Sequence, residues 1–411
     1  MKFLHIADLH FGKRLHGFSL IDNGDQPFWA AQFLQLVEDT APDAVVIAGD
    51  VYDSGNPGKE AVALLSDMLT QILEKHIPVL MVAGNHDSGE KLAFLSGILE
   101  KDGLYIAGKP EREMKHVTLQ DEHGDVTFWL LPFVFPALVA DVLEDDSIRD
   151  YDTAVRKYIA AQEIDFSRRN VLVAHQNVLA NGAEAERGGS ETMIGGVGEI
   201  DFTAFDGFDY VALGHIHAAQ SIGRREVRYA GSPLCYHFSE VKKPKKGPVC
   251  VTLDAKGDAA GIELCTLQAK HNMREVRGAF DEILAAETAA TARGEYIRAV
   301  LTDDVIPVDA TAQLKALYDE RGSYLMEVVR DVNRAVLSDA QRDVQAAQKQ
   351  PPEALFSEFY TERTGGDVLD QKQAELVRFT TQQMQLSDTP DRFTDADIEA
   401  ILKFALEQEG E

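Results

Sequence analysis

The stretch Val-Leu-Met-Val-Ala-Gly-Asn-His-Asp (residues 79–87) runs from five apolar residues directly into a glycine and three polar side chains. Its apolar half has the length and β-branching typical of a strand that is buried on both faces. Its polar half starts where that strand would end, with the turn-forming pair Gly84-Asn85. Strands buried on both faces occur in sheets that are covered by helices, so the stretch predicts an α/β fold with polar loops at one edge.

The same arrangement recurs on both sides of this stretch. Four further short apolar runs have the form of buried strands and cover residues 3–7, 44–48, 171–174 and 210–213. Helical patterns at 28–40 and 59–75 lie between the first strands, and alternation of this kind predicts an α/β sandwich. Residues 227–267 are predicted to be all-β. The longest uncharged run, residues 126–140, contains two prolines and is too short to span a bilayer, so it is interpreted as buried core.

Polar side chains with metal-binding or acid–base chemistry follow all five predicted strands. Five of the twelve histidines lie at these five ends, where loops converge in an open α/β sheet. In chain order the residues are Asp8 and His10, then Asp50 and Asp53, then Asn85, His86 and Asp87, then His175, and finally His215 and His217.

Carboxylate, imidazole and amide donors together indicate a site for two divalent metal ions. Such donors suit Mn²⁺, Mg²⁺, Fe²⁺ or Zn²⁺, and a carboxylate can bridge two cations about 3.5–4 Å apart. The three cysteines form no Cys-x-x-Cys pair, which argues against a thiolate zinc site. Taken singly, each motif has an ordinary structural explanation, either a turn or a satisfied core histidine. The combination in this order favours metal binding.

The ordered set of motifs resembles the calcineurin-like metallophosphoesterase superfamily. The flanking sequence is similar to its double-strand-break repair branch, which includes the bacterial SbcCD nucleases. The segments that carry this resemblance are HIADLHFGK (5–13), IAGDVYDSGNP (47–57), VLMVAGNHDSGEKL (79–92), DYVALGHIHAAQ (209–220) and YAGSPLCYHFSE (229–240). The fold that the resemblance implies is a metallophosphoesterase β-sandwich flanked by helices, with a small α/β capping domain and C-terminal partner-binding helices.

The resemblance also implies roles for the polar residues. One metal would be held by Asp8, His10, Asp50 and His217, and the other by Asp50 as the bridge with Asn85, His175 and His215. His86 would face the scissile phosphate, stabilise charge in the transition state and protonate the leaving sugar oxygen. Asp53 or Asp87 could orient that imidazole, although relatives in the repair branch often carry a second histidine at the Asp53 position. Mn²⁺ is the usual activator in the family, and Mg²⁺ is compatible with the same donors.

The resemblance further implies a DNA nuclease with double-strand exonuclease and hairpin endonuclease activity. Its partners would be DNA, an SbcC-type ATPase whose coiled coil is gripped by the C-terminal helices, and a second copy of the chain in a heterotetramer. The ATP would bind the ATPase, because this sequence contains no GxxxxGK[ST] motif. Residues 94–99 are possible contributors to the contact between copies.

Three units are predicted along the 411 residues. Residues 1–268 form the nuclease domain, and residues 269–335 a small capping domain that positions DNA. Residues 336–411 contain a Gln-rich linker ending at Pro352, followed by amphipathic helices in which Phe356, Phe359, Tyr360, Leu376 and Phe379 suit a partner groove. The alternative is that these helices pack within the chain, onto the capping domain.

The net charge of −28 is unusual for a protein that binds DNA. Basic candidates near the site are Lys13, Arg14, His16, Arg187 and the run Lys242, Lys243, Lys245 and Lys246. In the capping unit, Arg274, Arg277 and Arg298 are candidates for phosphate contacts. We expect a cytoplasmic protein without a membrane segment or a secretory leader. Two alternatives remain: an enzyme of the same superfamily that acts on small phosphoesters, and a non-catalytic scaffold.

Overall fold

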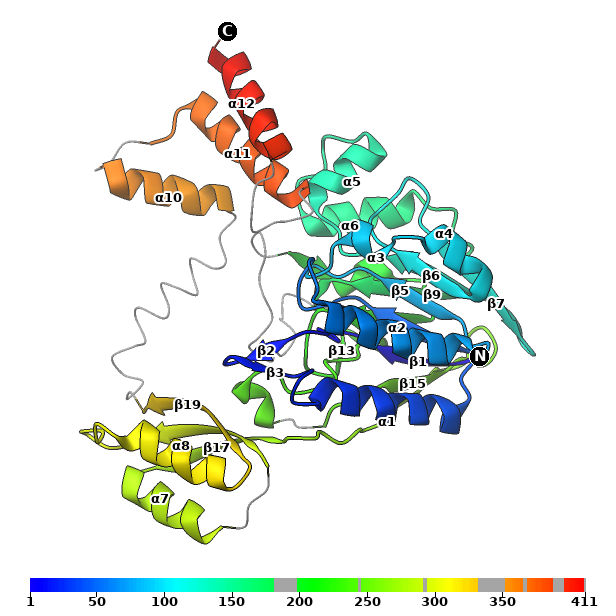
Figure 1. Cartoon of the computed structure of the whole chain (residues 1–411). Coiled ribbons are helices and arrows are strands. Elements are labelled where there is room, and N and C mark those ends of the chain that lie inside the picture. The colour runs from blue at the N-terminus through cyan, green and yellow to red at the C-terminus, as the bar shows by residue number, and fades with distance from the viewer. Residues whose placement is uncertain are drawn as a thin grey trace.

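A computed structural model describes residues 1–180, 198–242, 245–290, 294–331, 352–364, 368–386 and 395–409. Its centre is a pair of six-stranded sheets packed face to face (Figure 1). The first sheet has the order β16 (Gly261–Leu264), β15 (Val249–Thr252), β1 (Lys2–Ile6), β4 (Ala44–Ala48), β5 (Val79–Val82) and β6 (Leu104–Ala107). The second has the order β13 (Gln220–Ile222), β14 (Arg224–Tyr229), β12 (Tyr210–Gly214), β9 (Arg169–His175), β8 (Gly124–Leu131) and β7 (His116–Asp121).

Helices cover the outer face of each sheet. Helices α1 (Asp25–Thr40) and α2 (Lys59–Leu73) pack on the first sheet, and α5 (Pro136–Leu143) and α6 (Tyr151–Ala160) on the second. The sequence of helix α2 explains this packing. Its buried residues are spaced mostly three or four positions apart, so they form one apolar face that lies on the sheet. These residues are Ala61, Leu65, Met68, Leu69 and Ile72. The predicted α/β sandwich is confirmed.

The core between the sheets is apolar and aromatic. The Phe3 ring of β1 meets Phe128 of β8 and Tyr210 of β12 edge-on, with ring centroids 5.4 and 5.6 Å apart. All three side chains are fully buried, and each contributes roughly 1.5–3 kcal/mol through apolar burial. This core fixes the two sheets relative to each other.

The strands that carry the predicted site end at one edge of the sandwich. Strands β1, β4 and β5 are parallel neighbours in the first sheet, and β9 and β12 are parallel neighbours in the second. Strand β4 also lies against both β9 and β12 across the core. The loops that follow these five strands therefore meet, although they come from two different sheets.

A separate three-stranded parallel sheet follows the sandwich. It consists of β17 (Met273–Gly278), β18 (Tyr296–Leu301) and β19 (Tyr324–Arg330), with α7 (Phe280–Ala289) and α8 (Ala310–Glu320) packed on it. The carboxylate of Asp25 at the start of α1 accepts hydrogen bonds from the Tyr296 hydroxyl and from His271 Nδ1, the latter at 2.9 Å. Phe18 also packs edge-on against Tyr324, with centroids 5.4 Å apart. These contacts join the small sheet to the sandwich.

The C-terminal part forms the helices α10 (Pro352–Thr364), α11 (Gln371–Leu386) and α12 (Asp395–Glu409). Phe379 of α11 stacks on Phe404 of α12 with centroids 4.2 Å apart, and α11 also contacts α5 of the sandwich (Figure 1). Phe356 and Phe359 of α10 remain exposed. Residues 341–351 of the predicted linker lie outside the described residues. Among the helices that the structure describes, none is long and apolar enough to cross a lipid bilayer.

Shorter elements complete the described chain. They are β2 (Arg14–Leu15), β3 (Phe18–Ser19), α3 (Gly89–Leu92), α4 (Ser96–Leu99), η1 (Glu100–Asp102), β10 (Asn177–Leu179), β11 (Glu199–Asp201), η2 (Phe202–Phe205) and the 3₁₀-helix η3 (Phe238–Lys242). Element η3 lies inside the segment 227–267, for which the sequence predicts only β-structure, so that prediction holds only for the strands on either side of it.

Candidate metal centre

The first loop of the site follows β1 and is held in an unusual backbone conformation. Asp8 and His10 have φ angles of 54° and 44°, in the left-handed region that side chains other than glycine rarely adopt. Their backbone N–H groups donate to the carbonyls of Gly49 and Asp50 at 3.0 and 2.9 Å. The loops after β1 and β4 therefore fix each other, and strain of this kind concentrates at functional sites.

Asp50 lies at the centre of the cluster. Its Oδ2 is 3.5 Å from His10 Nε2 and 3.4 Å from His175 Nε2. Its Oδ1 accepts the backbone N–H of His86 at 2.9 Å. The side chain is buried, so one carboxylate oxygen faces imidazoles from both sheets, as a bridging ligand must.

Three residues face one another on one side of Asp50. Asn85 Oδ1 lies 3.1 Å from His175 Nε2 and 3.0 Å from His215 Nδ1. His175 Nδ1 donates to the carbonyl of Ala48 at 2.8 Å, which leaves the Nε2 lone pair directed into the site.

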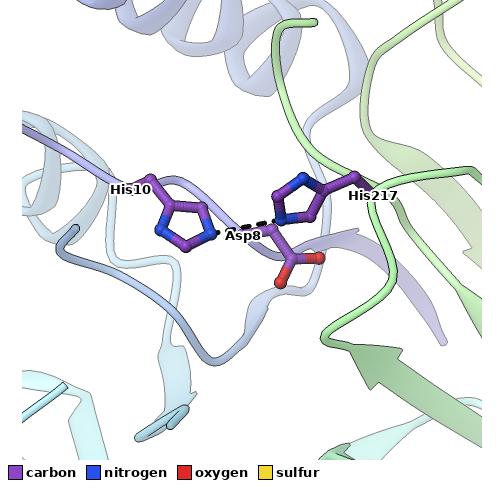
Figure 2. Close-up of side chains that lie close together, drawn as sticks. All are labelled: Asp8, His10 and His217. Carbon is purple, nitrogen blue, oxygen red and sulfur yellow. Dashed lines mark hydrogen bonds between the residues drawn. The ribbon is translucent and has the colours of Figure 1, made fainter. Parts of the chain in front are cut away.

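Asp8, His10 and His217 converge on the other side (Figure 2). The Nε2 atoms of His10 and His217 are 3.2 Å apart. Asp8 Oδ1 accepts the backbone N–H of His215 at 2.9 Å, whereas Asp8 Oδ2 is buried with no hydrogen-bond partner among the described residues. Buried polar atoms are normally satisfied, so an unpaired carboxylate oxygen on a residue clustered with two imidazoles fits a cation.

Burial raises the pKa of a carboxyl group and lowers that of an imidazole, and neighbouring charges add to or oppose this effect. Burial, reinforced by the nearby Asp50, raises the pKa of Asp8 to about 6. Burial also lowers the pKa of His10 to about 4. For His175 burial works in the same lowering direction, but Asp50 outweighs it and raises the pKa to about 9. A cation would stabilise ionised carboxylates and neutral imidazoles together, which are the forms that bind metal.

His86 lies beside this cluster at its open side. Its Nδ1 donates to the backbone carbonyl of Asp53 at 3.1 Å, and its Nε2 is 4.0 Å from Asp50 Oδ2. Its side chain is 20% exposed, whereas those of His10 and His175 are almost fully buried. This geometry leaves Nε2 available for a proton that a substrate could receive.

Comparison with known proteins adds to this geometry. Residues 1–219 match the family model described as calcineurin-like phosphoesterase, and residues 269–364 match one described as type 5 capsule protein repressor C-terminal domain. The D component of the nuclease SbcCD from Staphylococcus epidermidis is 32% identical over 322 residues, covering 77% of this chain and 83% of that protein. The same component from Staphylococcus saprophyticus is 29% identical over 385 residues, covering 93% of this chain and 98% of that protein.

The chain belongs to the SbcD family of SbcCD nuclease components. Members of this family are hydrolases of the nuclease class, and the metallophosphoesterase domain implies divalent metal ions. The resemblance found in the sequence is therefore confirmed. The donors described above supply the nitrogen and oxygen ligands that such ions require.

Asp53 and Asp87 contact different groups in this member of the SbcD family. Asp53 Oδ1 lies 2.7 Å from Lys13 Nζ and 3.3 Å from His10 Nδ1, so its carboxylate faces a predicted ligand rather than His86. The Asp87 carboxylate accepts the backbone N–H groups of Val51, Tyr52 and Gly84 at 3.1, 2.9 and 2.9 Å. Asp87 thus clamps the loops after β4 and β5 to each other, and neither carboxylate contacts the His86 ring directly.

Two glycines let the loops of this SbcD-family site approach one another. A Cβ atom on Gly84 would lie 2.2 Å from Asp50 Oδ1, and one on Gly214 would lie 1.9 Å from the Ala48 carbonyl oxygen. No side chain fits at such distances, so these positions require glycine for close approach.

Sequence reasoning does not identify Glu240 as part of the site. Burial by itself raises the pKa of Glu240, but contacts with His217 and Lys246 outweigh it and lower the pKa to about 2. Lys246 is a candidate for DNA contact by sequence, yet it is buried and bonded to Glu240 at 2.6 Å. A run of lysines carries no signal that one member points inward.

The arginines predicted to contact phosphate are paired within the small sheet. Arg274 binds Glu287 and Glu295 at 2.8 Å, and Arg298 lies 3.1 Å from Glu327. Arg277 binds Asp331. Their charge is largely neutralised by acidic neighbours, so the structure gives little support to these three as DNA contacts. Arg187 and Lys243 lie outside the described residues.

Proposed function

We propose that this chain is the DNA-cleaving component of an SbcCD-type complex, and that it hydrolyses phosphodiester bonds with two divalent cations. The observation that carries the proposal is the convergence of seven donor side chains, Asp50 at their centre, from five strand ends in two sheets. One cation is assigned to Asp8, His10, Asp50 and His217. The other is assigned to Asp50, Asn85, His175 and His215.

Bound cations would supply an activated water and neutralise the charge that develops on the phosphoryl group. The residues of the chain would hold them and handle the proton. Asp50 would contribute to both sites, and the backbone carbonyl of Asp53 holds His86 Nδ1. In our proposal a protonated His86 Nε2 delivers its proton to the leaving sugar oxygen.

We infer that Mn²⁺ serves this site better than Mg²⁺. Four of the seven proposed ligands are imidazole nitrogens, whereas Mg²⁺ strongly prefers oxygen ligands and retains water. Mn²⁺ accepts mixed nitrogen and oxygen donors, which matches this set.

A division of labour along the chain completes the proposal. Residues 1–268 cleave DNA, with double-strand exonuclease and hairpin endonuclease activity. Residues 269–335 form a capping domain that positions DNA, and residues 336–411 bind an SbcC-type ATPase. The contacts of Asp25 with His271 and Tyr296 support a cap that is seated on the catalytic unit.

Cleavage of end-labelled linear duplex DNA by the purified chain with Mn²⁺ tests this function. We expect Mn²⁺-dependent shortening of the duplex and opening of DNA hairpins, both stimulated by the ATPase partner and ATP. Bis-p-nitrophenyl phosphate, assayed in parallel, reports on the metal site alone. Turnover of that ester without DNA cleavage, both with and without the ATPase partner, would favour a small-phosphoester enzyme. Failure of the chain to bind divalent ions would favour a non-catalytic scaffold.

The ATPase partner is expected to bind the exposed aromatic residues of α10. Phe356 and Phe359 are 44% and 56% exposed, with ring centroids 6.4 Å apart. Replacing both by aspartate should reduce capture of an SbcC-type ATPase at least about tenfold, because charges oppose burial in an apolar groove. Capture is measured with both purified proteins.

The control for this variant is Val308→Asp, which changes a fully exposed residue of the small sheet unit. It should leave capture unchanged. Equal capture of the α10 variant and the native chain would place the ATPase contact elsewhere.

A second copy of the chain is expected to pack on α3 and α4. Phe94, Leu95 and Ile98 are 71%, 49% and 63% exposed and lie close together in sequence. A cluster of large exposed apolar side chains marks an interaction surface.

Phe94→Asp together with Ile98→Asp should convert a dimer into a monomer, as measured by light scattering during gel filtration. The control variant Val62→Asp, on the exposed face of α2, should leave the dimer intact. A native chain that is monomeric at high concentration would argue against this interface.

A further inference from the structure

Ser232, Glu240 and Lys246 form a buried polar network beneath His217. Lys246 Nζ donates to the backbone carbonyl of His217 at 2.6 Å, to Ser232 Oγ at 2.9 Å and to Glu240 Oε2 at 2.6 Å. Lys246 and Glu240 are only 6% and 5% exposed. Three acceptors around one ammonium group satisfy all of its protons, so this buried cation is fully compensated.

The second carboxylate oxygen of Glu240 faces the imidazole of His217. Glu240 Oε1 lies 3.7 Å from His217 Nδ1 and also accepts the backbone N–H of Tyr236 at 3.2 Å. On the opposite side of the ring, His217 Nε2 faces His10 Nε2. The ring is thus placed between a carboxylate and the proposed metal position.

The neighbouring histidines also have an oxygen beside the distal ring nitrogen. His175 Nδ1 donates to the carbonyl of Ala48, whereas His10 Nδ1 lies 3.3 Å from Asp53 Oδ1 without forming a hydrogen bond in the described residues. A ligand imidazole whose distal nitrogen is held by an oxygen keeps the tautomer and ring orientation that present the other nitrogen to metal. Among these three oxygen partners, only Glu240 depends for its own position on a buried ion pair.

We propose that Glu240, held in place by Lys246, is the positioning residue for His217 and thereby tunes one of the two cation sites. The inference rests on the proposed ligand set. It assigns a role to two residues that lie outside that set, and it explains why Lys246 is buried whereas Lys242 and Lys245 are exposed.

The test compares Mn²⁺ binding and thermal stability of the full chain. Removing only one member of the pair would leave a buried charge uncompensated, so the decisive variant is the double substitution Glu240→Gln and Lys246→Met. Its melting temperature without metal should stay close to that of the native chain. Calorimetric titration should show about 10- to 100-fold weaker Mn²⁺ binding at one of two sites. The electron paramagnetic resonance spectrum of bound Mn²⁺ should change as well.

A second variant keeps the ion pair but shortens its acidic member. Glu240→Asp retains the charge that compensates Lys246 and withdraws the carboxylate from His217 Nδ1. It should also weaken Mn²⁺ binding at one site with little change in melting temperature. If the double variant does not fold, Glu240→Asp therefore tests whether Glu240 positions His217.

The matched control is the triple substitution Arg274→Met, Glu287→Gln and Glu295→Gln, which removes a complete ion-pair network within the small sheet. It should leave both Mn²⁺ affinities unchanged. Native affinity at both sites in the folded Glu240 variants would overturn the positioning role alone. Absence of Mn²⁺ binding by the native chain would overturn the proposed function and this inference with it.

Discussion

Replacing Asp50 by asparagine is expected to remove tight binding of both cations and to reduce DNA cleavage by at least about four orders of magnitude. Enzymes commonly accelerate reactions by about 10⁶-fold or more, and the metal pair supplies a large part of that in this class of chemistry. Asp50 Oδ2 lies within 3.5 Å of imidazoles on both sides of the site. A neutral amide cannot replace a charge shared by two cations.

Thermal denaturation separates this result from simple unfolding. Burial opposes the charge of Asp50, but the imidazoles of His175, His86 and His10 outweigh it and hold the pKa of Asp50 well below its usual range, so this charge stabilises the metal-free fold. We therefore expect metal-free Asp50→Asn to melt earlier than the metal-free native chain, and Mn²⁺ binding is measured at a temperature where both proteins are folded. The native chain should gain about 2.7 kcal/mol of unfolding free energy per site at a hundredfold excess of Mn²⁺ over the dissociation constant, and the variant much less.

Asp67 is an exposed residue of α2, and the control variant Asp67→Asn should keep both tight Mn²⁺ binding and DNA cleavage. Retention of two tightly bound Mn²⁺ ions by Asp50→Asn would show that Asp50 does not bridge.

Replacing His86 by glutamine should lower DNA cleavage by about 10²- to 10⁴-fold while two Mn²⁺ ions remain bound. His86 Nδ1 is held by the Asp53 carbonyl, and its partly exposed ring lies at the open side of the cluster. Removing the imidazole therefore takes away a proton donor without removing a proposed ligand. Metal content is measured by elemental analysis, and cleavage on end-labelled duplex.

A substrate with a better leaving group tests the assigned proton transfer. The p-nitrophenolate of bis-p-nitrophenyl phosphate departs without a proton, so His86→Gln should impair its hydrolysis much less than that of DNA. Loss of one Mn²⁺ ion would make His86 a ligand. An equal loss on both substrates would indicate that it acts by stabilising charge instead.

The strands and loops that carry the site can be predicted because their signals are local. The strand at residues 44–48 is entirely apolar and buried, and polar residues follow it directly. The run at 126–140 is interpreted from sequence as buried core without an assigned element. It contributes most of β8 and most of α5, because prolines at 132 and 136 divide one apolar run between a strand and a helix.

The arrangement of charged groups cannot be predicted from the chain. Sequence patterns predict that a lysine is exposed, since most lysines are, and Lys246 is buried only because Glu240 and two oxygens surround it. By resemblance, Asp53 or Asp87 could orient the His86 ring. The Asp53 carboxylate lies beside Lys13 and His10 while its backbone carbonyl holds His86 Nδ1. The Asp87 carboxylate accepts three backbone N–H groups, and these contacts depend on how the loops after β1, β4 and β5 turn.

The origin of the donors in two different sheets has a mechanical consequence. Asp8, Asp50 and Asn85 follow strands of one sheet, whereas His175, His215 and His217 follow strands of the other. Ions bound between them would act as cross-links at the rim of the sandwich, resisting any sliding of one layer over the other. The rigidity of the metal site would then come partly from the same ions that take part in phosphodiester hydrolysis.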